Sequence, residues 1–245
     1  MTYQWRRGKV RDMLQLSDNL LALVQSTRQS AFDRHICDIP FKGHVLTELA
    51  AWWFQKIEEA KICKTHYLVH RHNIMFAKPC TVIPLEIIVR GYITGNTSTS
   101  MWTNYKNGMR EYCGVKLEEN YVKNQKLSAP VITPTTKGEK DELISPTQIV
   151  EQGYVTQEVW DVIADTAMKL FEFGVAEAAK KGLILVDTKY EFGYDSDGNL
   201  TLIDEVHTCD SSRYWIADAY DDCMDKGVEP KKYDKDIVRY WLKEN

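Results

Sequence analysis

The hydrophobic positions in the first third of the chain fall mainly in short runs that are typical of β-strands. Three such runs cover residues 19–26 (NLLALVQS), 66–76 (HYLVHRHNIMF) and 81–93 (TVIPLEIIVRGYI). Between the first two runs, apolar residues recur at spacings of three and four, which predicts a helix; they are Leu46, Leu49, Ala50, Trp53 and Ile57. The pattern therefore predicts a β-rich first part that contains one long helix.

Helix boundary signals become clear in the second half of the chain. Residues 145–148 (SPTQ) form a capping box with proline at the first helical position, and Gly153 ends this short helix. Thr156 begins a longer helix that stops at Gly182. Its apolar face consists of Trp160, Ile163, Ala164, Ala167, Leu170, Phe171, Gly174 and Ala178. Residues 126–142 are predicted to be extended, and residues 236–243 to form a last amphipathic segment. Strands and helices mix without strict alternation, which favours an α+β fold.

The strongest chemical pattern lies in a predicted hairpin at residues 183–207. Its first strand reads LILVDTKYEFGY, so Asp187, Lys189 and Glu191 fall at period two and project from one face. An Asp-Gly pair at 197–198 favours a two-residue type I′ turn. That turn predicts a register in which Glu191 stands directly opposite Asp204.

Two carboxylates opposite each other in a strand pair repel, so this register needs a compensating positive charge. A divalent cation is suited to the task, and Mg²⁺ typically takes one or two carboxylates together with substrate phosphates. Glu191 and Asp204 are therefore candidate metal ligands. The alternative is a surface hairpin whose acids are solvated. The functional interpretation is favoured because the charges continue an otherwise apolar strand.

Other segments carry weaker signals. Residues 8–12 (GKVRD) can fold over phosphates, although a basic surface turn explains the same pattern more simply. Glu86 and Arg90 share one face of an apolar strand. They form either a buried ion pair or a site in which the arginine binds a phosphate or carboxylate. Residues 96–100 (NTSTS) and 210–213 (DSSR) either cap helices or bind anions.

Composition and charge narrow the class of protein. The chain has 31 Lys and Arg against 35 Asp and Glu, a net charge of −4, which lacks the basic excess of general nucleic-acid binding. No apolar run approaches the roughly 18–20 residues that span a bilayer, and the N-terminus lacks the apolar centre of a signal peptide. The six cysteines form no C-x-x-C pair. We therefore expect a cytoplasmic protein with reduced thiols and no nucleic-acid or membrane partner.

A set of ordered segments carries a resemblance to one family. The segments are GKVRD (8–12), STRQSAFDR (26–34), PLEIIVRGYITG (84–95), LSAPVITPTTKGEKDE (127–142), LVDTKYEFG (185–193), LIDEVHTCDSSRYW (202–215) and YDKDIVRYWL (233–242). In this order and spacing the chain resembles the phosphoribosylaminoimidazole-succinocarboxamide synthases, or SAICAR synthetases, from residue 6 to its last residue. The number and order of the motifs make the resemblance specific.

The resemblance implies an ATP-dependent ligase of de novo purine synthesis. Such an enzyme joins L-aspartate to the carboxylate of carboxyaminoimidazole ribonucleotide (CAIR) to give SAICAR, through an acyl phosphate, with ATP as co-substrate and Mg²⁺ as cofactor. It also implies a two-domain fold related to ATP-grasp enzymes, with ATP between the domains. Residues 1–85 are expected to resemble the small lobe of protein kinases, and residues 86–245 to hold the ribonucleotide and metal. A small-molecule kinase with the same ATP and metal site is the alternative, and a homodimer is one candidate oligomeric state.

The resemblance also implies roles for individual residues. Those expected at ATP are Gly8, Lys9, Val10, Arg11 and Glu86. Those expected at the substrates are Arg90, Asn96, Ser98, Asp210, Ser211 and Arg213, with Ser30 and Asp33 in the same cleft. The residues expected at the reacting carboxylate are Asp187 and Lys189, and those at Mg²⁺ are Glu191 and Asp204.

Three positions depart from the usual pattern of the family. Asn96 stands where serine is more frequent, Lys140 where histidine precedes Asp-Glu, and Cys209 where proline is common. Ser98 is the residue expected to take over the substrate contact of Asn96. None of the three departures removes a group that the chemistry needs.

Overall fold

The computed structural model describes residues 4–32, 34–138 and 141–244. The chain divides into two compact units. The first consists of Met1–Val82, Phe192–Ser211 and Lys235–Asn245, and the second of Ile83–Glu191 and Ser212–Asp234. The sequence predicts one boundary after residue 85, whereas the chain crosses between the units four times. The later segments return because the chain beyond Glu191 pairs with strands of the first unit.

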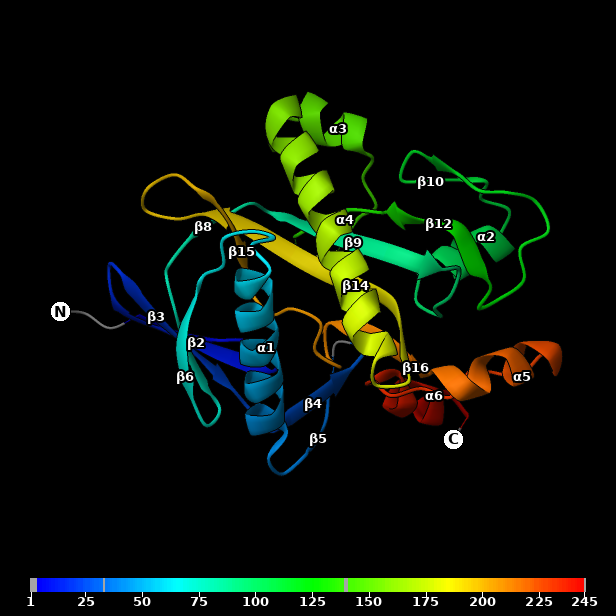
Figure 1. Cartoon of the computed structure of the whole chain (residues 1–245), viewed down its shortest axis with the longest axis horizontal. Coiled ribbons are helices and arrows are strands. Elements are labelled where there is room, and N and C mark those ends of the chain that lie inside the picture. The colour runs from blue at the N-terminus through cyan, green and yellow to red at the C-terminus, as the bar shows by residue number, and fades with distance from the viewer. Residues whose placement is uncertain (1–3, 33, 139–140, 245) are drawn as a thin grey trace. The chain divides into compact units, whose positions relative to one another are not determined.

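The first unit is built on a five-stranded antiparallel sheet in the order β1-β2-β3-β7-β6 (Figure 1). The strands are β1 (Gln4–Arg7), β2 (Arg11–Ser17), β3 (Leu20–Gln25), β6 (Tyr67–Arg71) and β7 (Ile74–Ala77). Helix α1 (Lys42–Glu59) packs on β3, β6 and β7, and buries Leu46, Phe54 and Ile57. The helix predicted from the apolar spacing is thus confirmed. A hairpin of β4 (Arg28–Ala31) and β5 (Arg34–Asp38) precedes it.

Two of the predicted strands are each divided in two. The run at 66–76 is the hairpin β6–β7, because His72 adopts a left-handed φ of +56° and reverses the chain. The run at 81–93 contains β8 (Thr81–Val82) and β9 (Leu85–Tyr92). Pro84 lies between them and has no N–H to donate to a ladder.

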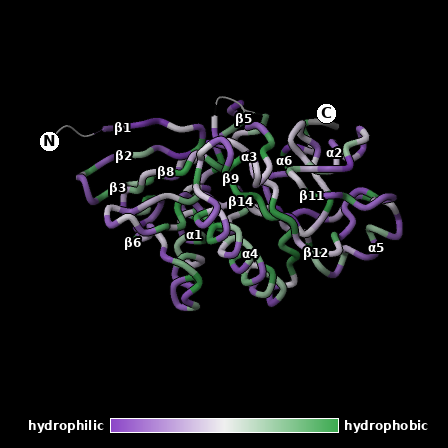
Figure 2. The backbone as a smooth tube through the Cα atoms, turned by 90° about the horizontal axis from the view of Figure 1, so that it is seen from above, coloured by the Kyte–Doolittle hydropathy of each residue, from purple (hydrophilic) through white to green (hydrophobic). Residues whose placement is uncertain are grey.

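The second unit is built on antiparallel pairs around β9 and β14 (Leu183–Tyr194). Strand β9 lies between β14 on one side and β12 (Lys126–Ile132) with β13 (Thr135–Thr136) on the other. Strand β16 (Ser212–Ile216) pairs with the far edge of β14. Figure 2 shows hydrophobic residues concentrated along β9 and β14. Beyond Glu191, β14 continues in the first unit, where it pairs with β8.

Helices α3 (Pro146–Glu151) and α4 (Gln157–Ala179) begin where the sequence predicts. The capping box of α3 is complete, since Gln148 N–H donates to Ser145 Oγ and Ser145 N–H to Gln148 Oε1. The Thr156 side chain caps α4, which packs on β9 and β12. All of its predicted apolar face is fully buried except Ala164, which is half-buried. Mixed helices and antiparallel sheets confirm the α+β class.

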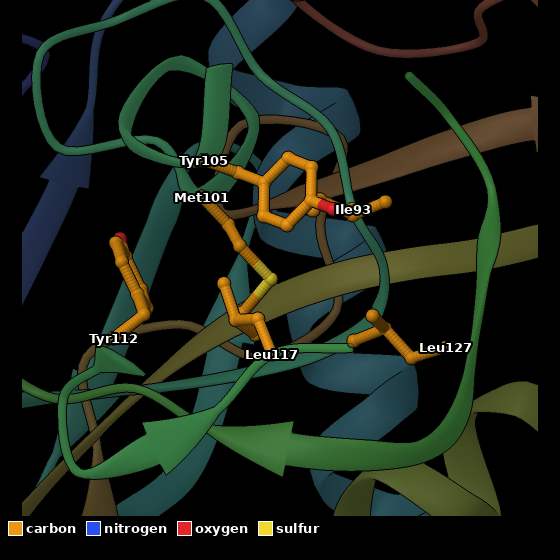
Figure 3. Packing of buried hydrophobic residues seen from close by; sticks show 6 residues of the cluster. All are labelled: Ile93, Met101, Tyr105, Tyr112, Leu117 and Leu127. Carbon is orange, nitrogen blue, oxygen red and sulfur yellow. The ribbon is translucent and has the colours of Figure 1, made fainter. Parts of the chain in front are cut away.

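A satellite core supports the segment that follows β9. Figure 3 shows this cluster, which consists of Ile93, Met101, Tyr105, Tyr112, Leu117 and Leu127. It joins α2 (Met101–Lys106) to the short hairpin β10 (Glu111–Tyr112) and β11 (Val115–Lys116). The chain is completed by β15 (Leu200–Ile203), α5 (Tyr220–Asp225) and α6 (Asp236–Glu244). No helix in the described part of the chain is long and apolar enough to cross a membrane.

Candidate functional site

The second unit carries a row of charged side chains along β14. Asp187, Lys189 and Glu191 share one face of the strand, as their spacing predicts. The carboxylates of Asp187 and Glu191 are almost fully buried, at 4% and 3% side-chain exposure. Buried carboxylates persist only when they are paired or hydrogen-bonded, and each member of this row meets opposite charges from neighbouring strands.

Asp187 lies between two arginines that come from the strands on either side. Arg90 on β9 and Arg213 on β16 both stand opposite it in the ladder. Their Nη1 atoms donate to Asp187 Oδ2 at 3.2 and 2.6 Å. The pairing of β14 with β16 shifts register between Leu185 and Asp187, so Asp187 stands opposite Arg213, and Thr188 opposite Ser212. This bulge makes the three charged residues neighbours across three strands.

Lys189 joins a second group of charges further along the same face. Its Nζ donates to Glu86 Oε1 at 3.2 Å and also to Glu191. The other oxygen of Glu191 accepts a hydrogen bond from Lys137, which follows β13. Glu86 in turn accepts a hydrogen bond from Thr135 at 3.2 Å. Cations and carboxylates therefore alternate along this face, which compensates the cost of burying each of them.

The ion pair between Glu86 and Arg90 that the sequence left as an alternative is not formed. Arg90 instead uses Nη1 for Asp187 and donates Nε to Thr133 Oγ1 at 2.8 Å. Glu86 and Arg90 are four residues apart on one strand face, and each hydrogen-bonds to residues on adjacent strands instead. Arg90 is only 4% exposed, so its guanidinium has a fixed orientation.

Residues 96–100 lead from β9 into α2. Ser100 occupies the N-cap position of α2, and its Oγ donates to Thr97 carbonyl oxygen at 2.7 Å. Asn104 Nδ2 donates to the carbonyl oxygen of Ser98, whose side chain is exposed. Ser100 therefore stands at the N-cap position, but its side chain makes no capping hydrogen bond to α2. The substrate roles of Asn96 and Ser98 stay predictions.

In the first unit, the predicted phosphate loop connects β1 to β2. Arg28 on β4 holds it by donating to the carbonyl oxygens of Gly8 and Lys9, at 3.1 and 3.0 Å, and to Asp12 at 2.6 Å. The carbonyl oxygen of Val10 accepts from Ser26 Oγ at 2.6 Å. The backbone of the loop is therefore tied to the next strands.

A cavity of about 480 Å³ opens beside this loop. Its lining includes Arg7, Gly8, Lys9, Arg28, Ser30 and Arg34. The structure thus brings the predicted ATP residues Gly8 and Lys9 together with Ser30, which was predicted at the substrates. The lining has four cations against one carboxylate, Asp38, and this excess of positive charge favours an anionic ligand. Two predicted positions, Asp33 and the departure at Lys140, lie outside the described residues.

The hairpin that carries Asp204 differs from the prediction. Asp195 N–H donates to Asn199 carbonyl oxygen at 3.1 Å and Gly198 N–H to Asp195 carbonyl oxygen at 3.0 Å, with Gly198 at φ +77°. The loop therefore has three residues, and the type I′ turn is wrong. The Asp195 carboxylate favours the longer loop because it accepts from the N–H groups of Asp197 and Asn199.

Asp204 also lies outside the ladder in which the sequence placed it. Strand β15 ends at Ile203, and Asp204 has a left-handed φ of +71°. The predicted cross-strand register of Glu191 with Asp204 is therefore wrong. Asp204 Oδ1 accepts from Arg11 Nη2 at 2.6 Å, and Arg11 lies 3.7 Å from Glu205. Arg11 thus compensates two adjacent acids.

Glu205 and Thr208 organise the segment after β15. Burial raises the pKa of Glu205, and the guanidinium of Arg11 opposes this rise. Thr208 Oγ1 donates to Glu205 Oε2 at 2.6 Å and accepts from the N–H groups of Asp210 and Ser211. Asp210, which the sequence placed at the substrates, forms a buried ion pair with Lys42 at 3.3 Å. It does not cap a helix.

The candidate metal ligands have suitable chemistry. Glu191 and Asp204 supply hard carboxylate oxygens, the kind of donor that Mg²⁺ prefers, and each carboxylate is compensated by a basic side chain. Within the described residues, no three His, Cys, Asp or Glu side chains lie close enough to hold a metal by themselves. A magnesium ion that shares its ligands with phosphates needs no such cluster. The two residues fit Mg²⁺ as donors.

Several residues of these clusters were not singled out from the sequence. They are Arg28, Lys42, Thr133, Lys137 and Thr208. All of them except Lys42 lie inside the quoted motifs, so motif membership is a signal that could have found them. Lys42 carries no such signal, because a lysine before an apolar helix face is ordinary. Buried clusters of paired charges on adjacent strands are typical of enzymes that bind charged substrates.

Comparison with known proteins identifies the family. The model of the SAICAR synthetase family matches residues 4–245. The chain is 51% identical over 240 residues to the chloroplastic phosphoribosylaminoimidazole-succinocarboxamide synthase of Arabidopsis thaliana, covering 98% of this chain and 58% of the plant protein. It is 50% identical over 238 residues to the synthase of Legionella pneumophila strain Paris, covering 96% of this chain and 75% of the relative.

Solved structures show the same fold. The SAICAR synthase from Saccharomyces cerevisiae complexed with SAICAR superposes with a TM-score of 0.85 at 32% identity, covering 99% of this chain and 85% of that one. A type-2 SAICAR synthetase in complex with ADP superposes with a TM-score of 0.79 at 25% identity, covering 97% and 90%. The chain belongs to the SAICAR synthetase family.

Proposed function

We propose that this chain is the ATP-dependent ligase that joins L-aspartate to the carboxylate of CAIR, yielding SAICAR, ADP and phosphate. The match to the family over nearly all of the chain carries the proposal. The charged row on β14 supports it, because Arg90 and Arg213, expected at the ribonucleotide, both contact Asp187, expected at the reacting carboxylate.

The chemistry explains why ATP is consumed. A carboxylate is a poor electrophile, so one of its oxygens first takes the γ-phosphoryl group of ATP, and ADP leaves. The amine of L-aspartate then attacks the acyl carbon and forms the new C–N bond. The bond between the acyl carbon and the phosphate oxygen breaks, phosphate leaves with the electron pair, and the amine loses a proton. No protein nucleophile is needed, and the protein positions the reactants and offsets negative charge.

The residues of the second unit divide this work. Arg90 and Arg213 present guanidinium groups suited to a phosphate or carboxylate of the ribonucleotide. Asp187 holds both arginines through one oxygen, so we assign it a positioning role beside the reacting carboxylate. Lys189 offsets charge on the transferring phosphoryl group, as do Lys9 and Arg11 of the first unit.

Mg²⁺ is the proposed cofactor, with Glu191 and Asp204 as its protein ligands. When bound, the ion neutralises charge on the ATP phosphates. Lys137 and Lys189 orient Glu191 through hydrogen bonds, and Arg11 orients Asp204 in the same way.

The test is phosphate release by the purified chain with ATP, Mg²⁺, CAIR and L-aspartate, and with each substrate omitted in turn. We expect release, and the succinocarboxamide product, only when all three substrates are present. ADP formation at the full rate without aspartate would replace the ligase with a small-molecule kinase that uses the same site.

The homodimer stays a prediction. Light scattering across a concentration series, with and without ATP, gives the mass directly. A mass near 28.4 kDa throughout would contradict it.

A further inference from the structure

Lys42 occupies an electrostatically unfavourable position in the first unit. It is the first residue of α1, where the helix dipole favours anions and disfavours cations. Its side chain is only 9% exposed, so water does little to solvate the ammonium group. A buried cation at a helix N-terminus costs stability unless another group compensates it.

The start of α1 breaks two further local preferences. The N-cap residue, Phe41, has a left-handed φ of +63° and makes no side-chain cap. Gly43 presses its backbone against β3, since a Cβ there would lie 2.4 Å from the carbonyl oxygen of Gln25. This close approach fixes the position of Lys42. A helix start with a left-handed, uncapped N-cap residue and a buried cation departs from the usual preferences. Such departures are expected where a side chain has a functional role.

The contacts of Lys42 show what that task is. Its Nζ donates to Asp210 Oδ2 at 3.3 Å and to the carbonyl oxygen of Arg28 at 3.1 Å. Arg28 is the residue that holds the carbonyl oxygens of Gly8 and Lys9. Lys42 therefore lies between the loop at residues 8–12 and the segment at 208–211.

We propose that Lys42 is a positioning residue that fixes the Asp210 carboxylate and ties this substrate segment to the phosphate loop. The assignment of Asp210 to the ribonucleotide rests on the proposed function. The tie itself does not, because it follows from contacts within the first unit. Removing the charge of Lys42 frees Asp210 and loosens residues 208–211 while the rest of α1 stays folded.

The first experiment measures hydrogen exchange of the peptide that spans residues 204–213. Lys42→Met keeps the apolar stem but removes the charge. We expect the Asp210 and Ser211 amides, which donate to Thr208 Oγ1, to exchange about tenfold faster. Lys56→Met is the matched control on the same helix, because Lys56 is 39% exposed and pairs with Glu59, and it should leave this exchange unchanged.

The second experiment separates positioning from general stability. We expect Lys42→Met to raise the KM for CAIR about tenfold, the effect of losing one charged hydrogen bond, while the KM for ATP changes less than about threefold. Lys42→Arg retains the charge and should restore most of the CAIR affinity. A purely structural role would lower the folded fraction and affect both substrates alike. If Lys42→Met does not fold, Lys42→Gln takes its place with the same expectations.

The outcomes distinguish this proposal from the proposed function. A wild-type chain that fails to ligate CAIR, with faster exchange in Lys42→Met, overturns the ligase and leaves the tie standing. An active wild type whose 204–213 exchange and CAIR KM are unchanged in Lys42→Met overturns the positioning role. Equal increases of both KM values overturn it as well.

Discussion

The charged clusters of the two units are built on different kinds of backbone. In the second unit, Asp187, Lys189 and Glu191 alternate along a regular strand, and their partners stand on adjacent strands. In the first unit, Asp204 and Lys42 are placed by left-handed residues, by irregular backbone and by a helix start without a cap. The cluster of the second unit can be predicted from the sequence because its residues recur at a regular spacing. The cluster of the first unit can be recognised only in the folded structure.

The two candidate metal ligands differ from the prediction in how their negative charge is compensated. The predicted register needed a cation because Glu191 and Asp204 were to repel each other. In the structure Glu191 is compensated by Lys137 and Lys189, and Asp204 by Arg11. Without metal, neither carboxylate lacks a compensating positive charge. Removing either carboxylate therefore leaves basic side chains without their anion.

The largest effect is expected where the regular strand buries most charge. Asp187→Asn leaves Arg90 and Arg213 without their shared anion, so we expect the free energy of unfolding to fall by about 3–5 kcal/mol. Urea unfolding, followed by circular dichroism, measures the change. Asp165→Asn on the exposed side of α4 is the control, since Asp165 is 61% exposed and pairs with the equally exposed Lys169 at 2.6 Å. Equal, small changes in both variants would mean that Asp187 is not the centre of its cluster.

The next effect tests the proposed magnesium ligand. Glu191→Gln should fold but lose about 10²–10³ in turnover, because charge on the phosphoryl group is no longer neutralised. Stabilisation by Mg²⁺–ATP in thermal melts should shrink with it. Since two lysines lose their anion, the variant should also be less stable than the wild type without metal. Asp222→Asn on α5 is the control, and near-normal turnover of Glu191→Gln would remove the residue from the metal site.

A third, smaller effect separates the two substrates. Arg213→Ala should weaken the binding free energy of CAIR by about 1.5–3 kcal/mol, the range for hydrogen bonds to charged groups. ATP should be affected far less, because its predicted phosphate loop lies in the first unit. Calorimetric titration of each ligand gives both values. Arg110→Ala, which removes an exposed pair with Glu119, is the matched control, and equal losses for CAIR and ATP would contradict the assignment.

The effect that is smallest at neutral pH concerns the irregular segment of the first unit, and it grows as the pH falls. Burial lowers the pKa of His207 from 6.5 to about 3, and its ring lies against Trp53 at 4.5 Å between centroids. Below pH 6.5, His207 therefore binds a proton in the unfolded chain but stays neutral in the folded chain. The contribution of neutral His207 to the free energy of unfolding is fully present above pH 6.5. It falls as the pH drops toward 3, by up to about 1.4 kcal/mol per pH unit.

His207→Gln tests this pH dependence by removing the titrating group. Unfolding free energies measured between pH 7 and pH 4.5 should decline less steeply in the variant than in the wild type. His35→Gln, at 53% side-chain exposure, serves as the control. Parallel decline of the wild type and His207→Gln would mean that His207 is protonated in the folded chain.

The sequence predicted those elements whose signals are local. The capping box at Ser145, the cap at Thr156 and the shared face of Asp187, Lys189 and Glu191 all depend on short spacings. The turn after Asp195 could not be predicted, because an Asp-Gly pair suits both two- and three-residue loops and the Asp195 carboxylate decides between them. The role of Lys42 depends on contacts with residues far away in the chain, for which one sequence carries no signal.

The bulge in β14 has a consequence for how such a site can arise or be lost. In an unbroken antiparallel ladder continued from Leu185 and Tyr214, Asp187 would face Ser212, and Arg213 would point to the opposite side of the sheet. One additional residue in the strand, rather than any substitution, brings Asp187 and Arg213 together. A chain of the same composition that paired without the bulge would therefore keep every charged residue of the row and still separate Asp187 from Arg213. For this site, pairing register is inherited information as much as residue identity.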